Sequence, residues 1–234
     1  MKKAIIIVLS IFTTFNLFSQ TTGGSFCIGG MGIAKNTWLF NNNVLDDKNS
    51  SQEMDIAFGS SFGLNMSIYF TQNIGIGLDV LYATHNQKYN GVTDGITNTP
   101  YKSKFHLSSL DLPLYLRLST NGGAYFELGS YFSVITASQY SSDATGIYTA
   151  LIPASFDAKA NTTSFSIAPL LGMGIDINLT DNLILNPGFR FSYGVTDLKG
   201  VDGRGKTIDS YSVPEKTNSL SGGLLIGLVY RFDI

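Results

Sequence analysis

Apolar side chains recur at every second position in one segment of this chain after another. The clearest case is the stretch 110–118, where leucine fills all the even positions. The odd positions of the same stretch hold Asp111, Pro113, Tyr115 and Arg117. Because successive side chains of a strand point to opposite faces, this period predicts a strand with one apolar and one polar face. The same alternation, weakest in the first segment, predicts further strands at 25–33, 56–70, 74–83, 126–134, 165–177, 183–195 and 220–233.

The connections between these strands alternate in length. Tight turns are expected at 71–73, 120–122 and 180–182, and long polar loops near 34–55, 87–104, 137–162 and 199–217. Short turns at one end and long loops at the other are typical of bacterial outer-membrane barrels. In that arrangement both chain ends are expected on the periplasmic side, with the short turns.

The chemistry of the two strand faces distinguishes a membrane barrel from soluble alternatives. A soluble lipocalin-like barrel would place its apolar face inside, and a two-sheet sandwich is a third option. Here one face carries large Leu, Ile and Phe side chains, which a narrow barrel cannot enclose, and the other carries Gly, Ser and charge. Only 14% of residues are charged, against about 25% in soluble proteins. We predict an all-β fold, an eight-stranded antiparallel up-and-down transmembrane β-barrel over residues 20–234.

The N-terminus is typical of an export signal. Lys2 and Lys3 precede an apolar run at 4–18, and Ser19 is a small residue at a plausible cleavage point. The alternative, an uncleaved membrane anchor, needs about 20 apolar residues, and the run is shorter. We predict a cleaved signal peptide at 1–19. Cys27 is the single cysteine, so no internal disulfide is possible, and it is expected to be a small packed residue of the first strand.

Seven charged residues fall on the predicted inward faces. Unpaired charges would be costly inside a narrow barrel, so we expect them to pair and fill the lumen as a solid plug. The functional alternative is a thin ion path, because charges at membrane depth often mark one. The predicted lumen charge network consists of Asp79, Asp111, Arg117, Glu127, Asp176, Arg190 and Arg231.

Catalytic and cofactor chemistry has little support in the sequence. His85 and His106 flank the second long loop and, with Asp79 or Asp111, suggest a metal site or a general base. However, no HExxH, GxSxG or phosphate-binding glycine loop is present. The net charge of -2, with no basic cluster beyond Lys2 and Lys3, gives nucleic acid nothing to bind. We predict a protein that is not an enzyme and has no cofactor, metal or nucleic-acid partner.

Prolines interrupt three of the predicted strands, at Pro113, Pro169 and Pro187. Proline cannot donate to a β-ladder and is normally found at an edge or a bulge. Because a closed barrel has no edges, we expect a bulge or a local kink at each of the three.

Four segments in order resemble the PorT-like outer-membrane β-barrel family of Bacteroidetes. They are LDLPLYLRL (110–118), YFELGSYFSVI (125–135), APLLGMGIDINLTDNLILNPGFRFSYGVTDL (168–198) and LLIGLVYRF (224–232). The signal ending in Ser-Gln also suits that phylum. The resemblance implies an integral protein of the outer membrane of a Gram-negative bacterium. The name-giving member takes part in protein secretion, while most relatives are uncharacterised barrels.

The end of the chain resembles the signal read by the barrel-assembly machinery. Gly227, Tyr230 and Phe232 match its glycine and two aromatics, whereas Leu225 stands where a polar residue is usual and two residues follow Phe232. The partners expected are therefore this machinery, outer-membrane lipids and an envelope protein. The function expected is a structural or accessory envelope component with a link to secretion. A small-solute or ion channel is the alternative, and a lipid-modifying enzyme the third option.

Overall fold

The computed structural model describes residues 24–41, 52–92, 99–143, 155–199 and 216–233. Eight long strands run through these residues: β1 (Ser25–Asn41), β3 (Ala57–Tyr69), β4 (Ile74–Val92), β5 (Pro100–Ser119), β6 (Ala124–Ser142), β8 (Phe165–Ile175), β10 (Leu183–Tyr193) and β11 (Thr217–Asp233). Short elements complete the described part: β2 (Gln52–Asp55), β7 (Ser155–Asp157), β9 (Ile177–Asn178) and the 3₁₀ helix η3 (Lys159–Asn161). Among these residues, no helix is long and apolar enough to cross a membrane.

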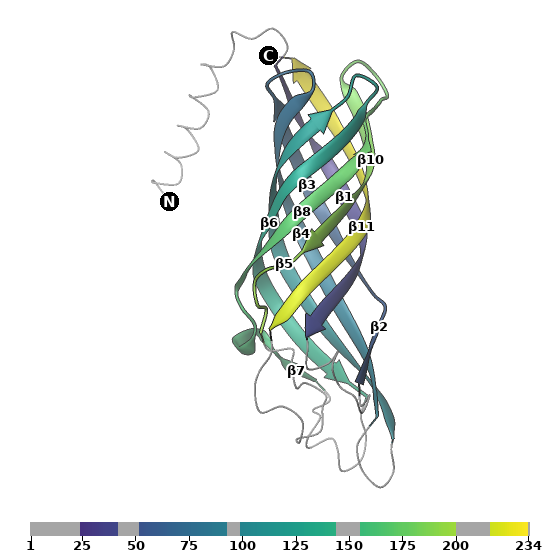
Figure 1. Cartoon of the computed structure of the whole chain (residues 1–234), viewed down its shortest axis with the longest axis vertical. Coiled ribbons are helices and arrows are strands. Elements are labelled where there is room, and N and C mark those ends of the chain that lie inside the picture. Colours follow the sequence, from purple (N-terminus) through teal and green to yellow (C-terminus); the bar gives the residue numbers. More distant parts are fainter. Residues whose placement is uncertain (1–23, 42–51, 93–98, 144–154, 200–215, 234) are drawn as a thin grey trace, which may run out of the picture.

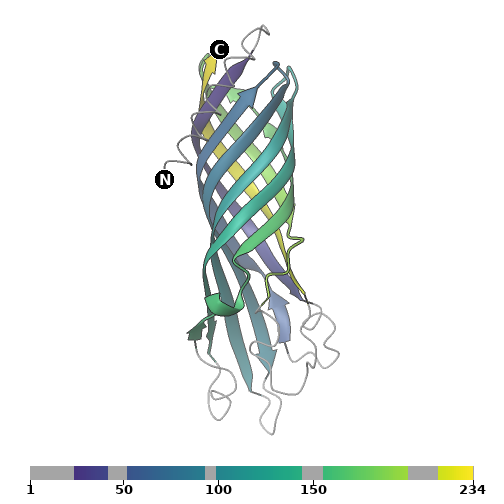
Figure 2. The same ribbon diagram turned by 90° about the vertical axis from the view of Figure 1, so that its left-hand side faces the viewer.

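The strands close into a ring (Figure 1). Each long strand pairs antiparallel with its neighbours in the order β11-β1-β3-β4-β5-β6-β8-β10, and β10 pairs in turn with β11. The β1–β11 ladder runs without interruption from Ser25 opposite Asp233 to Asn41 opposite Thr217. Figure 2 shows the strong tilt of the strands around the barrel. The prediction of an eight-stranded antiparallel barrel is confirmed.

The large apolar side chains lie on the outside of the barrel. Leu114 is 46% exposed and Leu128 is 54% exposed, whereas Asp111 and Glu127 on the same two strands are 1% exposed. This outer apolar belt faces lipid, because a barrel that leaves no backbone group unpaired is one of the two structures that can cross a bilayer. The predicted assignment of apolar faces outward and polar faces inward is therefore correct.

The expected tight turns are present and cluster at one end of the barrel, where β1 begins and β11 ends (Figure 1). In two of them a threonine hydroxyl caps the turn. Thr71 Oγ1 accepts from the Ile74 amide at 3.0 Å, and Thr180 Oγ1 accepts from the Leu183 amide at 3.0 Å. Gly123 ends the third turn with φ of 86°, a conformation that favours glycine. We refer to this end as the turn end and to the other as the loop end.

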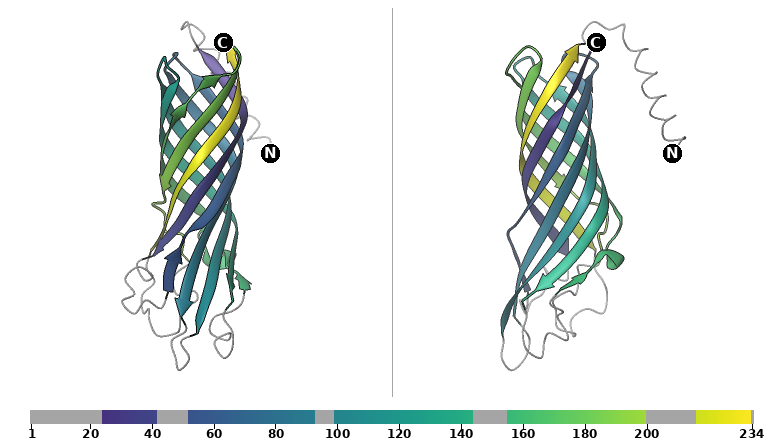
Figure 3. Two further views of the ribbon diagram at one scale, coloured as in Figure 1. Left: turned by 90° about the vertical axis from the view of Figure 1, so that its right-hand side faces the viewer. Right: turned by 180° about the vertical axis from the view of Figure 1, so that it is seen from behind.

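The strands at the loop end are longer than predicted. Residues 34–41, 87–92, 100–104 and 137–142 were expected in loops but belong to β1, β4, β5 and β6. On β4 and β5 the outer positions of these segments include Lys88, Lys102 and Lys104, so the outward apolar pattern of the belt does not continue there. Figures 2 and 3 show β4 and β5 projecting past the rest of the barrel, and β2 pairs with the outer part of β4.

Of the two irregularities expected at each proline, the bulge is absent, and the local kink stays a prediction. The ladders keep one register across Pro113, Pro169 and Pro187. Instead, one ladder beside each proline has a local gap. In the β4–β5 ladder, no pairs form between Leu78↔Leu114 and Leu81↔Asp111, which is where Pro113 lies. The β8–β10 ladder covers only Gly188 to Ser192 on β10, and so it stops short of Pro187 and Pro169. The missing amide hydrogen is thus accommodated by a gap in one ladder. The register shift that does occur lies between Ser108 and Ser109, opposite β6.

Glycine on the inner wall makes room for tyrosine. A Cβ at Gly77 would overlap the Tyr115 ring, whereas a Cβ at the outward-facing Gly30 would meet no atom closer than the Gly63 oxygen at 4.0 Å. We expect Gly77→Ala to destabilise the barrel by about 1–3 kcal/mol, because overpacking displaces a hydrogen-bonded ring. Gly30→Ala is the matched control and should leave stability unchanged. The measurement is the urea midpoint for unfolding from lipid vesicles, and equal midpoints for the two variants would contradict this packing argument.

Candidate functional site

A chain of ion pairs crosses the lumen from one side of the wall to the other. Arg190 of β10 donates from Nε to Glu127 Oε2 at 2.7 Å and from Nη1 to Asp79 Oδ2 at 2.6 Å. Arg117 of β5 donates to Glu127 Oε1 at 3.3 Å and also pairs with Asp176, which lies between β8 and β9. These five residues form the central ion-pair cluster, and four of them are at most 4% exposed. The cluster therefore joins five separate segments of the wall across the barrel.

Neutral polar and aromatic groups complete the central ion-pair cluster. Asn65 donates to Asp79 Oδ1 at 2.6 Å, and the Tyr115 hydroxyl donates to the same oxygen at 3.0 Å. The guanidinium carbon of Arg190 lies 4.7 Å from the Tyr115 ring centroid, and that of Arg117 lies 3.6 Å from the centroid of Tyr125. Buried charges are tolerated only when they are paired and hydrogen-bonded, and these contacts meet that requirement for Asp79 and Glu127.

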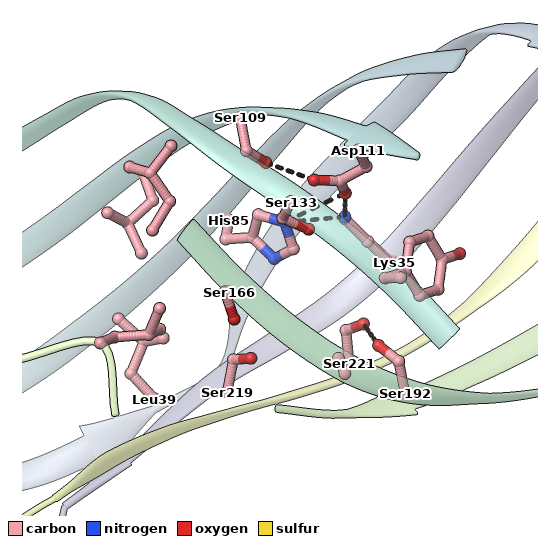
Figure 4. Close-up of a pocket in the computed structure, with 15 residues that line it drawn as sticks. Lys35, Leu39, His85, Ser109, Asp111, Ser133, Ser166, Ser192, Ser219 and Ser221 are labelled. Atoms are coloured by element: carbon pink, nitrogen blue, oxygen red, sulfur yellow. Dashed lines mark hydrogen bonds and ion pairs between the residues drawn. The ribbon is translucent and has the colours of Figure 1, made fainter. Parts of the chain in front are cut away.

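A second polar group lies between the central cluster and the loop end (Figure 4). Lys35 Nζ lies 3.3 Å from His85 Nε2 and 4.0 Å from Asp111 Oδ2, and Ser109 donates to Asp111 Oδ1 at 2.7 Å. These side chains line a cavity of about 40 Å³, together with Ser133, Ser166, Ser192, Ser219 and Ser221. We call it the serine chamber. Its volume and hydroxyl lining suit a small group of ordered waters.

Apolar side chains bound the serine chamber on the loop side. Leu39, Leu107, Ile135 and Leu198 line it and belong to a larger buried cluster with Tyr89, Phe105, Tyr140 and Ala158. On the turn side, Tyr131 and Ala168 line the chamber and pack in a second cluster that includes Tyr115. The chamber is therefore set between two packed layers of side chains inside the barrel.

The structure divides the seven predicted lumen charges into three groups. Asp79, Arg117, Glu127, Asp176 and Arg190 meet in the central ion-pair cluster. Asp111 belongs to the serine chamber instead. Arg231 lines an open hollow at the turn end with Asp176, and among the described residues no carboxylate oxygen lies within 4.0 Å of its guanidinium. It stands opposite Cys27 in the β1–β11 register, and the Cys27 side chain is buried, as expected.

Sequence reasoning missed Lys35, the cation of the serine chamber, because it fell in a predicted loop. A signal was available: Cys27, Met31 and Ile33 face inward, and the same alternation continues to Lys35 and Leu39. Asn65 lies on the polar face of the strand predicted at 56–70, but the alternation predicts neither its hydrogen bond to Asp79 nor that of Asn186 to Asp176.

The two histidines do not form a joint site. His85 faces the lumen beside Asp111, whereas His106 stands opposite Asn86 in the β4–β5 register and hydrogen-bonds its Oδ1 at 2.6 Å. Because adjacent residues of a strand face opposite sides, His85 and His106 lie on different sides of the wall. In the part of the chain that the structure describes, no group of three or more His, Cys, Asp or Glu side chains is arranged to hold a metal ion.

The residues of the predicted assembly signal lie on β11. Gly227 faces the lumen, while Tyr230 and Phe232 are 45% and 49% exposed on the outer surface, with ring centroids 4.7 Å apart. Phe232 also stacks on Phe26 of β1. This position fits an aromatic girdle at the turn end of the apolar belt. Recognition by the assembly machinery remains a prediction.

Removal of Arg190 tests the energetic role of the central ion-pair cluster. We expect Arg190→Met to destabilise the barrel by about 3–5 kcal/mol, because Asp79 and Glu127 would be left buried with fewer partners. The urea midpoint for unfolding from vesicles measures this change. The triple variant Arg190→Met, Asp79→Asn, Glu127→Gln removes all three charges and should recover most of the loss. A single variant as stable as the natural protein would show that the cluster is not needed for stability.

Three solved structures show a partial likeness to this chain. Neisserial surface protein A is 17% identical, with a TM-score of 0.42 over 90% of this chain and 99% of that one. Ail, the attachment invasion locus protein of Yersinia pestis, is 12% identical, with a TM-score of 0.41 over 90% of this chain and 100% of that one. OprG from Pseudomonas aeruginosa is 15% identical, with a TM-score of 0.38 over 91% of this chain and 97% of that one.

No curated protein is similar enough to this chain to count as a match. The sequence does match a family model, described as an outer membrane protein beta-barrel domain, over residues 29–200. The matched region runs from β1 to just past β10 and contains every residue of the central ion-pair cluster and most of the serine chamber. The chain therefore belongs to the outer membrane protein beta-barrel domain family, and its place is the outer membrane of a Gram-negative bacterium.

Proposed function

We propose that this protein is a non-enzymatic structural or accessory component of the envelope, with both chain ends periplasmic and the loop end outside. The observation that carries the proposal is the central ion-pair cluster, whose buried charges pair with one another across the lumen. A barrel of eight strands encloses room for little more than its own side chains. The protein then acts through its two ends and its outer surface.

The loop end offers the larger surface for contact. β4 and β5 project past the barrel, β2 pairs with β4, and β7 pairs with β6, so that an enlarged sheet stands beyond the apolar belt (Figure 3). Binding residues are often found on segments that a rigid scaffold positions in this way. An envelope protein is the partner that we propose here. The PorT-like resemblance supports a place in protein secretion, and the aromatic end of β11 supports handling by the barrel-assembly machinery.

A small-solute or ion channel is the second candidate, and the serine chamber favours it. The chamber shows that the lumen is not filled along its whole length. A path to the turn end would nevertheless have to pass the pairs between Arg190, Glu127 and Arg117. Each pair is buried, so opening the path means separating buried charges, which is costly.

Conductance separates the two candidates. We expect the purified protein in planar bilayers to show no stable single-channel steps, because the central ion-pair cluster occludes the lumen. The matched variants are Arg117→Ala and Arg190→Ala, each checked for folding by resistance to unfolding in cold detergent. Stable steps from the natural protein that either variant abolishes would contradict the occluded lumen and favour the channel.

Crosslinking in intact cells tests the accessory role. We expect a photo-crosslinker at position 102, on the projecting hairpin, to join the protein to another envelope protein. The matched control is the same group at position 114, which faces lipid in the apolar belt and should give no protein adduct. A compact monomer on native-size analysis, with no adduct from position 102, would contradict a stable accessory role.

A further inference from the structure

A serine, a histidine and an asparagine are hydrogen-bonded in a row on the outer face of the wall. His106 and Ser108 are alternate residues of β5 that both face outward, and Asn86 of β4 stands opposite His106 in the register. Ser108 Oγ lies 3.3 Å from His106 Nε2, and His106 Nδ1 lies 2.6 Å from Asn86 Oδ1. We call these three residues the outer triad. They belong neither to the central ion-pair cluster nor to the lining of the serine chamber.

The hydrogen bonds of the outer triad fix the roles of the two imidazole nitrogens. Asn86 Nδ2 donates to the Phe58 carbonyl at 2.5 Å, which leaves Asn86 Oδ1 turned toward the histidine. Because Oδ1 can only accept, His106 Nδ1 carries the hydrogen, and Nε2 of the neutral ring presents its lone pair to Ser108. The serine hydroxyl is therefore the donor to Nε2. A base in this position can take the proton of a serine nucleophile while the third group orients the base.

The backbone beside Ser108 is irregular. Ser108 stands opposite Ala137 of β6 and Ser109 opposite Ile135, so Thr136 is an extra residue that pairs in neither the β5–β6 nor the β6–β8 ladder. The Thr136 hydroxyl donates to the Ser108 carbonyl at 3.1 Å, which holds this bulge against the serine. Bulges are frequent next to active sites, and they leave one residue outside the ladder. The Thr136 amide is thus a backbone N–H beside the serine, the kind of group that stabilises an oxyanion.

The outer triad lies at the edge of the apolar belt. Leu110 of β5 and Tyr82 of β4 stand opposite each other and are both exposed, and Ser108 lies two residues beyond Leu110 toward the loop end. At about 3.3 Å per residue and a tilt of about 45°, Ser108 stands roughly 5 Å beyond Leu110 along the membrane normal. The ester groups of lipids lie at this depth, where the hydrocarbon core meets the headgroups.

Both halves of an acyl ester have a matching surface beside the outer triad. Phe58 and Phe62 of β3 are exposed on the same outer face, and the Phe62 ring centroid lies 5.6 Å from that of Tyr82. An acyl chain can pack along these rings. On the other side, His106 lines an open polar cleft of about 640 Å³ together with the exposed Gln139. This cleft can hold the hydrated alcohol half of the ester.

We infer that the outer triad cleaves ester-linked acyl chains of lipids in the leaflet at the loop end. Ser108 is 5% exposed, so the ester carbonyl approaches it from the cleft, past His106 and Thr136. Ser108 Oγ attacks the carbonyl carbon while its proton passes to His106 Nε2, and the Thr136 amide binds the oxyanion. The bond from this carbon to the alcohol oxygen then breaks, and the alcohol leaves with the proton from His106. Water attacks the acyl-serine with His106 again as base, which releases the fatty acid and restores Ser108.

This inference goes beyond the proposed function. It adds chemistry at the outer wall, and so it restricts the non-enzymatic role proposed above to the lumen and the two ends of the barrel. In the proposed orientation, the leaflet at the loop end is the outer one. A micelle assay does not depend on orientation, so a failure of the proposed orientation would change the leaflet and leave the reaction standing.

Hydrolysis can be measured with the full-length mature protein in nonionic micelles. The probes are a diacyl phosphatidylcholine and a disaccharide glycolipid with ester-linked acyl chains, and the readout is fatty acid released, measured by mass spectrometry. We expect release from at least one probe, and the probe that is cleaved identifies a glycerol or a sugar ester as the substrate. Ser108→Ala and His106→Gln should each lower the rate about 100-fold or more.

A fluorophosphonate reports on the nucleophile directly. We expect one adduct per chain, located at Ser108 by peptide mass spectrometry, absent in Ser108→Ala and formed more slowly in His106→Gln. The matched control is Ser60→Ala, on the outer face of β3, where the hydroxyl lies 3.3 Å from Thr84 Oγ1 instead of a histidine. This variant should keep both the adduct and hydrolysis. Each variant is checked for folding by resistance to unfolding in cold detergent.

Asn86 acts through the histidine and is a positioning residue. Asn86→Leu removes the acceptor for His106 Nδ1 and should lower kcat with little change in KM. Asn86→Asp keeps an oxygen acceptor at this place and should restore kcat. Equal losses in the two variants would show that Asn86 only supports the local structure, and would remove it from the triad.

Several outcomes would overturn the acyl-ester reaction. They are no fatty acid from either lipid, equal rates in the natural protein and Ser108→Ala, an adduct at a residue other than Ser108, or a Ser108 adduct without hydrolysis of either lipid. A loss in Ser60→Ala as large as that in Ser108→Ala would do the same. Conductance and crosslinking test the occluded lumen and the envelope partner, so either proposal can fail while the other stands.

Discussion

The closure of the hydrogen-bonded wall into a ring is the constraint on which the rest of the structure depends. A sheet in lipid has no water to satisfy a free edge, so β11 must meet β1, and it does so along the whole of β1. Closure with eight strands fixes a narrow lumen. The narrow lumen in turn requires glycine where Tyr115 lies against the wall, and it brings Arg117 and Arg190 within bonding distance of carboxylates on other strands.

The interior is arranged in layers along the axis. From the turn end toward the loop end, the central ion-pair cluster with Tyr115 is followed by apolar packing around Tyr131, then by the serine chamber, and finally by the apolar cluster around Phe105. Polar and apolar side chains thus succeed one another along the lumen as a packed core. This core holds the barrel together from inside, while lipid covers the outside.

The sequence allowed the strand faces, the three tight turns and the barrel class to be predicted, because lipid on one side forces a strict alternation. That signal is lost at the loop end, where inner positions such as Tyr89 and Phe105 are apolar and outer positions such as Lys104 are polar, and so the loop ends of β1, β4, β5 and β6 and the role of Lys35 were missed. The partners of the charges were also out of reach. Asp79 and Arg190 are 111 positions apart, and no local pattern relates them. The prolines do not mark bulges, because a β-ladder can lose the hydrogen bond of one missing amide and still keep its register.

The seam between the first and last strands has a consequence for how the chain reaches this state. Ser25 pairs with Asp233, so the ring cannot close until nearly the whole chain has been made and exported. Contacts of such long sequence separation form slowly. During that delay β1 and β11 each present an unpaired edge, which is a template for aggregation. The chain must therefore cross the periplasm in an unclosed state, with both of these edges still open to pairing with other chains.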